Sequence, residues 1–589
     1  MNQIKFIDYP GKIAVSIFNF LSEDSSFSII GFQLSYLFFV LVLSLLIYLK
    51  FLNSVRNYSG IKKILCSPIL FLTVSGIGVI LLRIPNLVLR ELNSDESQWI
   101  VNAATYYNGA VLWKDVSGFT GGPLIYLPLS LINHFGIELS YASIRMFGVI
   151  AYIIPIILFT YFTFRNLFNE TYSSVFTLPI ILFFSLSISN DFIAFNSELV
   201  SMVLIALSCF LFISFIKGNS ILKLIILGLI LGCFPYAKLQ AVPIGLIIAL
   251  LSVTEIFFFE APSKTKKVFS VFIFIIAGML PSLTFLVYLL NNDALNIFID
   301  DYILQNILYT NNGLASHIDG LAKFNLVLIL SSHTIETIWL FIVCMIVILF
   351  SSLQLFKTRS KIELQNFRVL IYLFLILVFS YISVCFPGNI FEHYQLLLIV
   401  PLIIFTGFIF GTSLPLSKSI FSTNKQLITF VLVSVFIPLA ITLYKGNKGI
   451  NFIAAKGNYQ ISSVSKEILK YTMPNERLAV WGWNHKFYIE TGLIQGTRHA
   501  NSYIEVYQYL RKQSIYLENY IEELKFNKPV IFLDATQPTF IGFTNPENLG
   551  HDKFPVLNNF IKSNYTLVSE INQKKIYVLN DRLIRMGLL

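Results

Sequence analysis

The sequence predicts an α-helical polytopic membrane protein with a small C-terminal α/β domain. The 589 residues are 56% hydrophobic and only 13% charged, whereas soluble proteins carry roughly 25% charged residues. Apolar runs of about 18 residues or more recur along the first three quarters, and each is long enough to span a membrane. These runs stop near residue 444 and charged residues become more frequent. We therefore place a transmembrane domain at 1–444 and an extracytoplasmic domain at 445–589.

Hydropathy places about twelve spans along the transmembrane domain. The expected spans are 28–49, 64–86, 143–163, 174–189, 194–216, 222–236, 239–259, 267–290, 334–351, 367–386, 394–412 and 426–444. The segments 174–189 and 222–236 are the shortest of these. The stretch 123–136 contains two prolines and is too short to cross, so we expect it to lie at the membrane surface.

Clusters of basic residues between the spans set the expected orientation. They fall after the first span, near 264–267, at 357–368 and at 418–425. Placing them in the cytoplasm puts the loops 86–143 and 291–322 and the C-terminal domain on the outer side. We therefore expect an integral protein of a bacterial inner membrane whose functional face is periplasmic. The net charge of +10 is explained by these clusters, so nucleic acid is not an expected partner.

The C-terminal domain shows strand and helix patterns. The segments "RLAVWGW" and "KPVIFLDA" predict buried strands, and "YTLVSEINQKKIYVLND" predicts a terminal hairpin. One amphipathic helix is expected over 502–525. The five cysteines lie in or beside apolar segments without CxxC spacing, so neither a disulfide framework nor a zinc-thiolate site is expected.

An acidic pair, Asp95 and Glu96, directly follows the second span in "RELNSDESQW". An acid at the bilayer centre costs about 2.5–3.5 kcal/mol on insertion scales, and less at the interface. One interpretation is a solvated pair of loop carboxylates. The other is a site, because the aromatic segment from Trp99 to Trp113 is expected to lie on the membrane and bracket a cleft. Partial burial there would raise the pKa of a carboxylate toward that of a general base.

A second acidic pair, Asp191 and Glu198, lies at the outer end of the 194–216 span. The spacing of seven residues puts both on one face if the helix begins early. The alternative is a pair of helix-start acids favoured by the macrodipole.

Four further residues lie at the same predicted edge: Lys238, Arg145, His393 and Tyr394. Lys238 and Arg145 are either phosphate contacts or side chains that snorkel to the interface. A single histidine such as His393 is more often structural than catalytic. Together the polar positions predict one cavity, lined by both charge signs, that suits a substrate with phosphate and hydroxyl groups.

Several common motifs are missing from the chain. It has no GxxxxGK[ST], HExxH, GxSxG or DxD motif, so nucleotide hydrolysis and soluble nucleotide-sugar chemistry are unsupported. The energy for any transfer must then come with the substrate. No cofactor is required by the sequence, and a divalent metal is left open.

The order and sidedness of these motifs resemble the polytopic GT-C type glycosyltransferases, near the protein O-mannosyltransferases and the lipid A aminoarabinose transferases. "SDESQW" matches their acidic motif in the first outer loop, which implies Asp95 as catalytic base and Glu96 as its neighbour. The aminoarabinose-transferase pattern has an Arg soon after the acids and a Lys just before a Pro, where this chain has Gln98 and Gly122. The donor phosphate contacts are therefore expected to differ.

The resemblance extends over most of the chain through other short matching segments. They are "GGPLIYLPLSLINHFG", "SIRMFGVIAY" with Arg145, "NSELVSMVLIAL" with Glu198, "AKLQAVPIGLIIAL" with Lys238, the "HY" of His393 and Tyr394, and the "VWG" strand with Trp481 and Gly482. The resemblance implies a polyprenyl-phosphate sugar as donor, a lipid, glycan or protein hydroxyl as acceptor, and inversion at the anomeric carbon.

Three rival interpretations remain at this point. A polymerase or ligase of lipid-linked glycans would share the face and the carrier. A transporter or flippase would favour broken helices and charges at the midplane, whereas the charges here gather at one edge. A scaffold would use the outer domain to bind a partner. In that domain, Trp483, His485 and Tyr488 are expected either to present to a glycan or to pack against the membrane domain.

Overall fold

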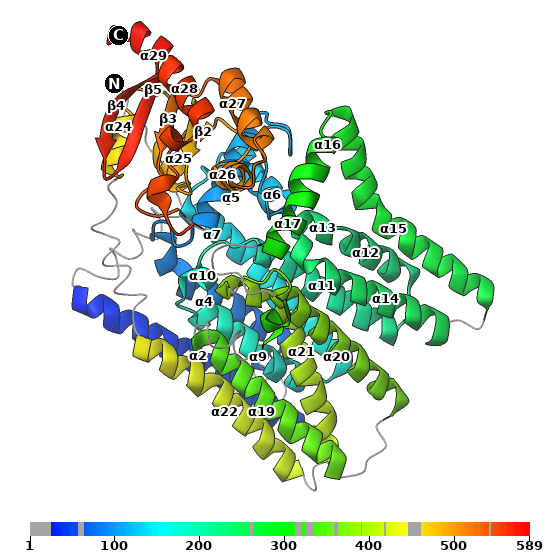
Figure 1. Cartoon of the computed structure of the whole chain (residues 1–589). Coiled ribbons are helices and arrows are strands. Elements are labelled where there is room, and N and C mark those ends of the chain that lie inside the picture. The colour runs from blue at the N-terminus through cyan, green and yellow to red at the C-terminus, as the bar shows by residue number, and fades with distance from the viewer. Residues whose placement is uncertain are drawn as a thin grey trace.

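The computed structural model describes residues 25–56, 64–259, 263–312, 320–325, 335–357, 363–389, 391–416, 420–445, 461–540 and 543–589. Long helices form one bundle, and a small sheet with its own helices covers one end of it (Figure 1). Some residues of the predicted basic clusters, and the start of the predicted C-terminal domain, lie outside the described residues.

Ten helices in the described part of the chain are long and apolar enough to cross a membrane, so the protein is an integral membrane protein. They are α2 (Ser25–Arg56), α4 (Pro68–Leu87), α7 (Tyr141–Gly148) continued through η1 (Val149–Ile153) into α8 (Ile154–Leu167), α11 (Glu198–Lys217), α14 (Val242–Phe259), α15 (Lys264–Asn291), α19 (Ile335–Lys357), α20 (Leu364–Cys385), α21 (Leu396–Ser413) and α22 (Ile420–Lys445). Each coincides with one expected span. The two shortest expected spans correspond to shorter apolar helices, α9 (Glu170–Leu186) and α12 (Ile221–Gly232).

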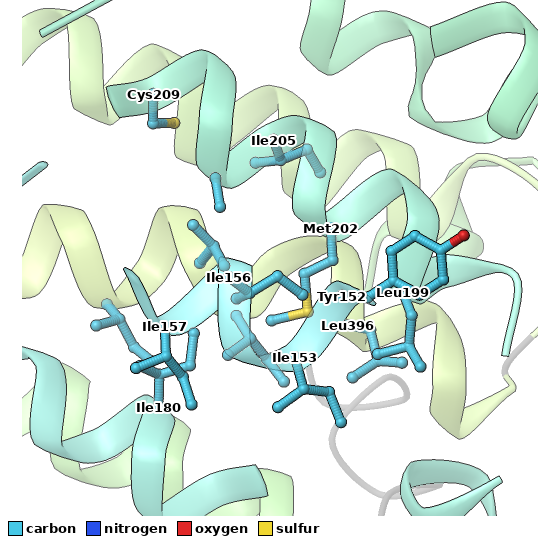
Figure 2. Close-up of a cluster of buried hydrophobic side chains, with 14 of the residues drawn as sticks. Tyr152, Ile153, Ile156, Ile157, Ile180, Leu199, Met202, Ile205, Cys209 and Leu396 are labelled. Atoms are coloured by element: carbon cyan, nitrogen blue, oxygen red, sulfur yellow. The ribbon is translucent and has the colours of Figure 1, made fainter. Parts of the chain in front are cut away.

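Apolar side chains, most of them isoleucine or leucine, pack together inside the bundle. Figure 2 shows Ile153 and Ile156 of the η1–α8 helix beside Met202 of α11, with Ile180 of α9 and Leu396 of α21 nearby. All five are buried. Helix α21 is buried on nearly every side, as expected for a helix that is hydrophobic all round.

Helices α12 and α15 approach each other through glycine. Gly228 and Gly232 lie four residues apart and therefore on one face of α12, opposite Phe274 and Gly278 of α15. A Cβ at Gly232 would clash with the carbonyl oxygen of Gly278. Small residues at such a contact let two backbones approach closely, and the resulting van der Waals packing favours helix association in lipid.

The loop 86–143 contains two short helices at the end of the bundle that carries the C-terminal sheet. They are α5 (Ser94–Tyr107) and α6 (Pro123–His134), the latter at the predicted short apolar stretch. The expectation that the aromatic segment lies on the membrane is wrong for α5. Trp99, Ile100 and Val101 are buried, because α5 is enclosed between the bundle and the C-terminal sheet region (Figure 1).

The C-terminal region contains a five-stranded sheet in the order β2-β1-β3-β5-β4. The strands are β1 (Arg477–Trp481), β2 (Ile494–Gln495), β3 (Ile531–Asp534), β4 (Tyr565–Ile571) and β5 (Lys574–Leu579). Strands β1, β2 and β3 are parallel, and the predicted terminal hairpin adds β5 and β4 in antiparallel pairing.

The helix expected over 502–525 is two helices, α26 (Tyr503–Leu510) and α27 (Ile515–Asn527). Lys512 has a φ of 64°, in the left-handed region, and this ends α26. The amphipathic pattern continues across the break, so hydrophobic periodicity alone did not reveal it.

A buried polar joint fixes this region to the bundle. Asp301, in η3 (Phe298–Leu304), accepts hydrogen bonds from Ser117 Oγ at 2.5 Å and from His499 Nε2 at 2.8 Å. Glu505 contacts the other ring nitrogen of His499 at 3.1 Å. Burial opposes the charge on His499, but the two carboxylates raise its pKa to about 10, so the imidazolium is retained at neutral pH.

The glycine contact predicts a position where added volume is not tolerated. Gly232→Val should force α12 away from α15 and lower the free energy of unfolding by about 1–3 kcal/mol, the range for overpacked contacts. The measurement is thermal unfolding in detergent. Gly218→Ala, at a position where a Cβ has no close contact, is the control. Equal stability of both variants would contradict the close approach.

Candidate active site

A buried ion pair between Arg145 and Glu96 organises the site end of the bundle. The guanidinium Nε donates to Glu96 Oε1 at 2.7 Å, and Nη2 donates to Glu96 Oε2 at 2.6 Å. The other three N–H groups donate to the carbonyl oxygens of Asn86, Leu89 and Arg90 at 2.6–2.7 Å. All five donors of the arginine are used, so Arg145 has none left for the phosphate contact that the sequence suggested.

Glu96 is equally occupied. Its Oε1 also accepts from the backbone N–H of Phe195 at 3.0 Å, and the residue is completely buried. The pair therefore connects the end of α4, the first turn of α5, α7 and the segment before α11. The geometry gives Glu96 and Arg145 a structural role, one residue away from Asp95.

Asp95 has a different environment from its neighbour. It sits at the second position of α5, half-buried, and its backbone N–H donates to the Asn93 cap at 2.9 Å. Among the described residues none donates a hydrogen bond to its carboxylate. Burial raises the pKa of Asp95, and the nearby charges of His393 and Lys238 only partly offset this. Such a carboxylate can accept a proton from a substrate.

Asp191 and His393 form a second polar pair. The short helix α10 (Asn190–Ile193) carries Asp191, and His393 lies in η5 (Glu392–Gln395). His393 Nδ1 contacts Asp191 Oδ2 at 2.9 Å, while Asn93 Nδ2 donates to Asp191 Oδ1 at 2.9 Å. Burial opposes ionisation of Asp191, but these partners hold its pKa below the usual range. Asn93 thus connects Asp191 with the turn that carries Asp95.

Lys238 and Glu198 form a third pair, in direct contact. Lys238 lies in the turn before η2 (Leu239–Ala241), and its ammonium also reaches Ser197 Oγ at 3.1 Å. The same ammonium lies 4.7 Å from the ring centre of Tyr394. An ammonium is a compact charge with three donors, so Lys238 can contact a ligand oxygen in addition to these partners.

A cavity of about 140 Å³ opens beside this pair. It is lined by Thr120, Lys238, Leu239, Gln240, Asn306, Ile307, Tyr309, Thr310, Phe386, Pro387 and Tyr394. Its polar lining is neutral apart from Lys238, and Gln240 Oε1 is buried without a hydrogen-bond partner. The charges of Asp95 and Glu198 also act on the hydroxyl of Tyr309, whose pKa is raised mainly by burial. The cavity and the charged cluster are therefore parts of one site.

The structure brings together six of the eight predicted site residues. They are Asp95, Asp191, Glu198, Lys238, His393 and Tyr394. The proposed sharing of one helix face by Asp191 and Glu198 is wrong. A break after α10 separates them, and α11 begins only at Glu198. They are nevertheless in the same site, because Asp191 contacts the ring of His393 and Glu198 contacts the ammonium of Lys238.

Sequence reasoning missed three contributors. Asn93 carried a helix-cap signal before "SDESQW" that went unused. Ser197 and Tyr309 lie far from the acidic motif in the sequence, and no local pattern distinguished them. The structure also shows the surroundings of Gln98 and Gly122, where the chain departs from the aminoarabinose-transferase pattern. Gln98 donates to the Gly118 carbonyl oxygen at 3.1 Å, and a Cβ at Gly122 would clash with the backbone of Tyr236.

Within the described residues, no three His, Cys, Asp or Glu side chains are grouped so that they could hold a metal ion.

Comparison with known proteins identifies the fold. No family model and no curated protein matches the chain. Among solved structures, ArnT from Cupriavidus metallidurans bound to undecaprenyl phosphate matches at 12% identity with a TM-score of 0.51, over 86% of this chain and 97% of that chain. Its apo state matches at 11% identity with the same TM-score and the same coverage. An oligosaccharyltransferase from Archaeoglobus fulgidus, tethered with an acceptor peptide, matches at 12% identity with a TM-score of 0.43, over 79% and 68%.

The similarity to ArnT confirms the predicted fold. The chain shares the fold of ArnT, with its helical bundle and the small C-terminal sheet region. At this level of identity the comparison carries the fold, and the chemistry rests on the site itself.

The buried pair predicts a large effect of removing one partner. Arg145→Ala leaves the Glu96 carboxylate buried without its counter-charge, so we expect the free energy of unfolding to fall by about 3–5 kcal/mol. Thermal or denaturant unfolding in detergent is the measurement. The control is Arg165→Ala, because the pair of Arg165 with Glu170 is half exposed, and its loss should change stability by less than about 1 kcal/mol. Similar losses for both variants would contradict the organising role of Arg145.

Proposed function

We propose that the protein is a membrane glycosyltransferase that moves a sugar from a polyprenyl-phosphate carrier to an acceptor hydroxyl at the outer face of the membrane. The observation that carries this proposal is the cavity beside Lys238, next to the half-buried carboxylate of Asp95, which receives no hydrogen bond from the described residues. The similarity of the fold to ArnT bound to undecaprenyl phosphate supports a lipid-linked donor.

The assignment of Asp95 as general base rests on the contrast with the other acids. Glu96, Asp191 and Glu198 are each engaged by a cation and by further donors. Asp95 lies among the same charges without such a partner, and burial raises its pKa. A raised pKa gives a general base a greater affinity for the proton that it accepts.

Lys238 is the proposed contact for the donor phosphate. It is the charged residue that lines the cavity, and Tyr394 and Tyr309 lie beside it. The cluster holds three carboxylates, Asp95, Asp191 and Glu198, against the two basic side chains His393 and Lys238. This balance favours a donor that brings a single phosphate charge over a diphosphate, since each added negative charge is repelled by the carboxylates.

The proposed reaction is a single displacement. The acceptor O–H gives its proton to Asp95 while its oxygen forms a bond to the anomeric carbon. The bond from that carbon to the phosphate oxygen breaks, and the phosphate leaves with the electron pair on its lipid carrier. Attack opposite the leaving group inverts the anomeric carbon. The lipid phosphate is a good leaving group, so a general acid is not required.

The expected orientation completes the proposal. Placing the predicted basic clusters in the cytoplasm puts this site and the C-terminal region, residues 445–589, on the periplasmic side of a bacterial inner membrane. The transmembrane part, 1–444, would then take up the donor laterally from the bilayer. The acceptor is a lipid, a glycan or a protein with a free hydroxyl.

The direct test is transfer from a purified polyprenyl-phosphate sugar. Asp95→Asn keeps the shape of the side chain and removes the base, so we expect the rate to fall by about 10²–10⁴-fold. Asp115→Asn is the matched control, because Asp115 lies in the same loop but caps a local turn. It should change the rate little. Activity of Asp95→Asn close to wild type would reject the base, and inactivity of the wild-type protein with several such donors would reject the donor class.

Asp95→Asn, which should lower the transfer rate, should not lower the stability of the protein. Because burial raises the pKa of Asp95, ionising this carboxyl opposes folding. The penalty is present in full above the raised pKa and disappears below the ordinary pKa of an aspartate. Asp95→Asn is therefore expected to unfold at the same temperature as wild type, or a higher one, at neutral pH, with the difference closing in acid. Thermal unfolding at several pH values measures this, and a lower unfolding temperature for Asp95→Asn at neutral pH would contradict it.

A further inference from the structure

Two side chains of the C-terminal region contact the residue directly before Asp95. Trp483 Nε1 donates to Ser94 Oγ at 3.1 Å, and His485 Nδ1 lies 3.1 Å from the Ser94 carbonyl oxygen. Ser94 is the first residue of α5 and lies 389 residues from Trp483 in the sequence. Both bonds therefore act on the helix turn that carries the proposed base.

The protonation of His485 is fixed by its surroundings. Asn501 Nδ2 lies 3.0 Å from His485 Nε2, and Asn501 Oδ1 already accepts from the N–H of Tyr503. The amide therefore donates to Nε2, which leaves the ring proton on Nδ1, where it is donated to Ser94. His485 is completely buried, and burial lowers its pKa to about 3. The neutral ring thus keeps one tautomer over the working range of pH.

The segment that carries these side chains is rigidly attached to the sheet. It follows β1 directly, and Gly482 turns the chain with a φ of 127°, where a Cβ would meet the backbone of Ala535. The N–H of Gly482 donates to Ser502 Oγ at 2.8 Å, and Asn484 Nδ2 donates to the Ala535 carbonyl oxygen at 2.7 Å. The position of the sheet is therefore transmitted to Ser94 without a flexible connection.

We infer that Trp483 and His485 are positioning residues for Asp95, so that the C-terminal region completes the active site by holding the first turn of α5. This inference rests on the proposed function for its catalytic consequence. It also assigns Trp483 to contact within the protein, in place of presentation to a glycan. A loss of either bond would let the turn move, and a displacement of about 1 Å at a catalytic group can cost about 100-fold in rate.

A second contact between the same region and the same helix offers a matched control. The N–H of Gln495, in β2, donates to Thr105 Oγ1 at 3.2 Å, near the far end of α5. Thr105→Val removes this bond while keeping the shape of the side chain. It tests whether any loss of contact between α5 and the sheet has the same effect as a loss at Ser94.

The first experiment measures backbone hydrogen exchange over residues 93–99 in the full-length protein, and it does not depend on activity. Trp483→Phe removes one donor, and His485→Gln moves the amide to the position of Nε2, which leaves Ser94 without its partner. Both are expected to speed exchange in this segment. His485→Asn places an amide N–H near the position of Nδ1 and should restore protection, and Thr105→Val should leave the segment unchanged. Unchanged exchange in both Trp483→Phe and His485→Gln would overturn the inference.

The second experiment measures transfer by the same variants. We expect kcat to fall by about 10- to 100-fold in Trp483→Phe and His485→Gln, with the KM for the donor unchanged, and to recover in His485→Asn. The double variant Trp483→Phe with Ser94→Ala should be no worse than either single one, because both remove the same bond. Faster exchange without a fall in kcat would overturn the coupling to Asp95. If the wild-type protein proves inactive, the exchange data still test whether Trp483 and His485 hold the turn at Ser94, and the inactivity counts against the proposed function alone.

Discussion

The ion pair of Arg145 and Glu96 is the interaction on which the rest of the site depends. Both side chains are buried, and every N–H group of the Arg145 guanidinium donates to Glu96 or to a backbone carbonyl oxygen. A buried pair of this kind contributes little net stability compared with a well-packed apolar contact, but breaking it is strongly unfavourable. What it provides is a fixed geometry among segments that are far apart in the sequence.

That geometry explains how two adjacent acids acquire different properties. Asp95 and Glu96 differ by one position on α5, which turns their side chains about 100° apart. Glu96 points to Arg145 and is fully compensated, whereas Asp95 points to the side where His393 and Lys238 are already occupied by other acids. Two carboxylates with different surroundings can take different roles. Here the division is between a structural acid and a proposed base.

Much of this could be predicted from the sequence, since the physics involved is local. Long apolar runs predicted the spans. Basic clusters predicted which span ends share a face, and six polar positions at those ends meet in one site. The saturation of Arg145 could not be predicted, because three of its acceptors are backbone carbonyls that no side-chain pattern reveals. The placement of α5 was missed for a related reason. Its aromatic face suits a membrane surface as well as a protein interior, and only the position of the sheet decides between them.

The sheet is therefore more than an attachment to the bundle. It is joined to the rest of the protein at several places, among them His499 between Asp301 and Glu505, and Trp483 and His485 at Ser94. The two histidines use opposite electrostatic states: His499 stays charged because carboxylates surround it, and His485 stays neutral because burial is uncompensated. Neither changes charge between about pH 5 and 8, so both joints keep their hydrogen bonds across that range. The contact of His485 with Ser94, beside the proposed base Asp95, therefore does not depend on a change in the charge of His485 over that range.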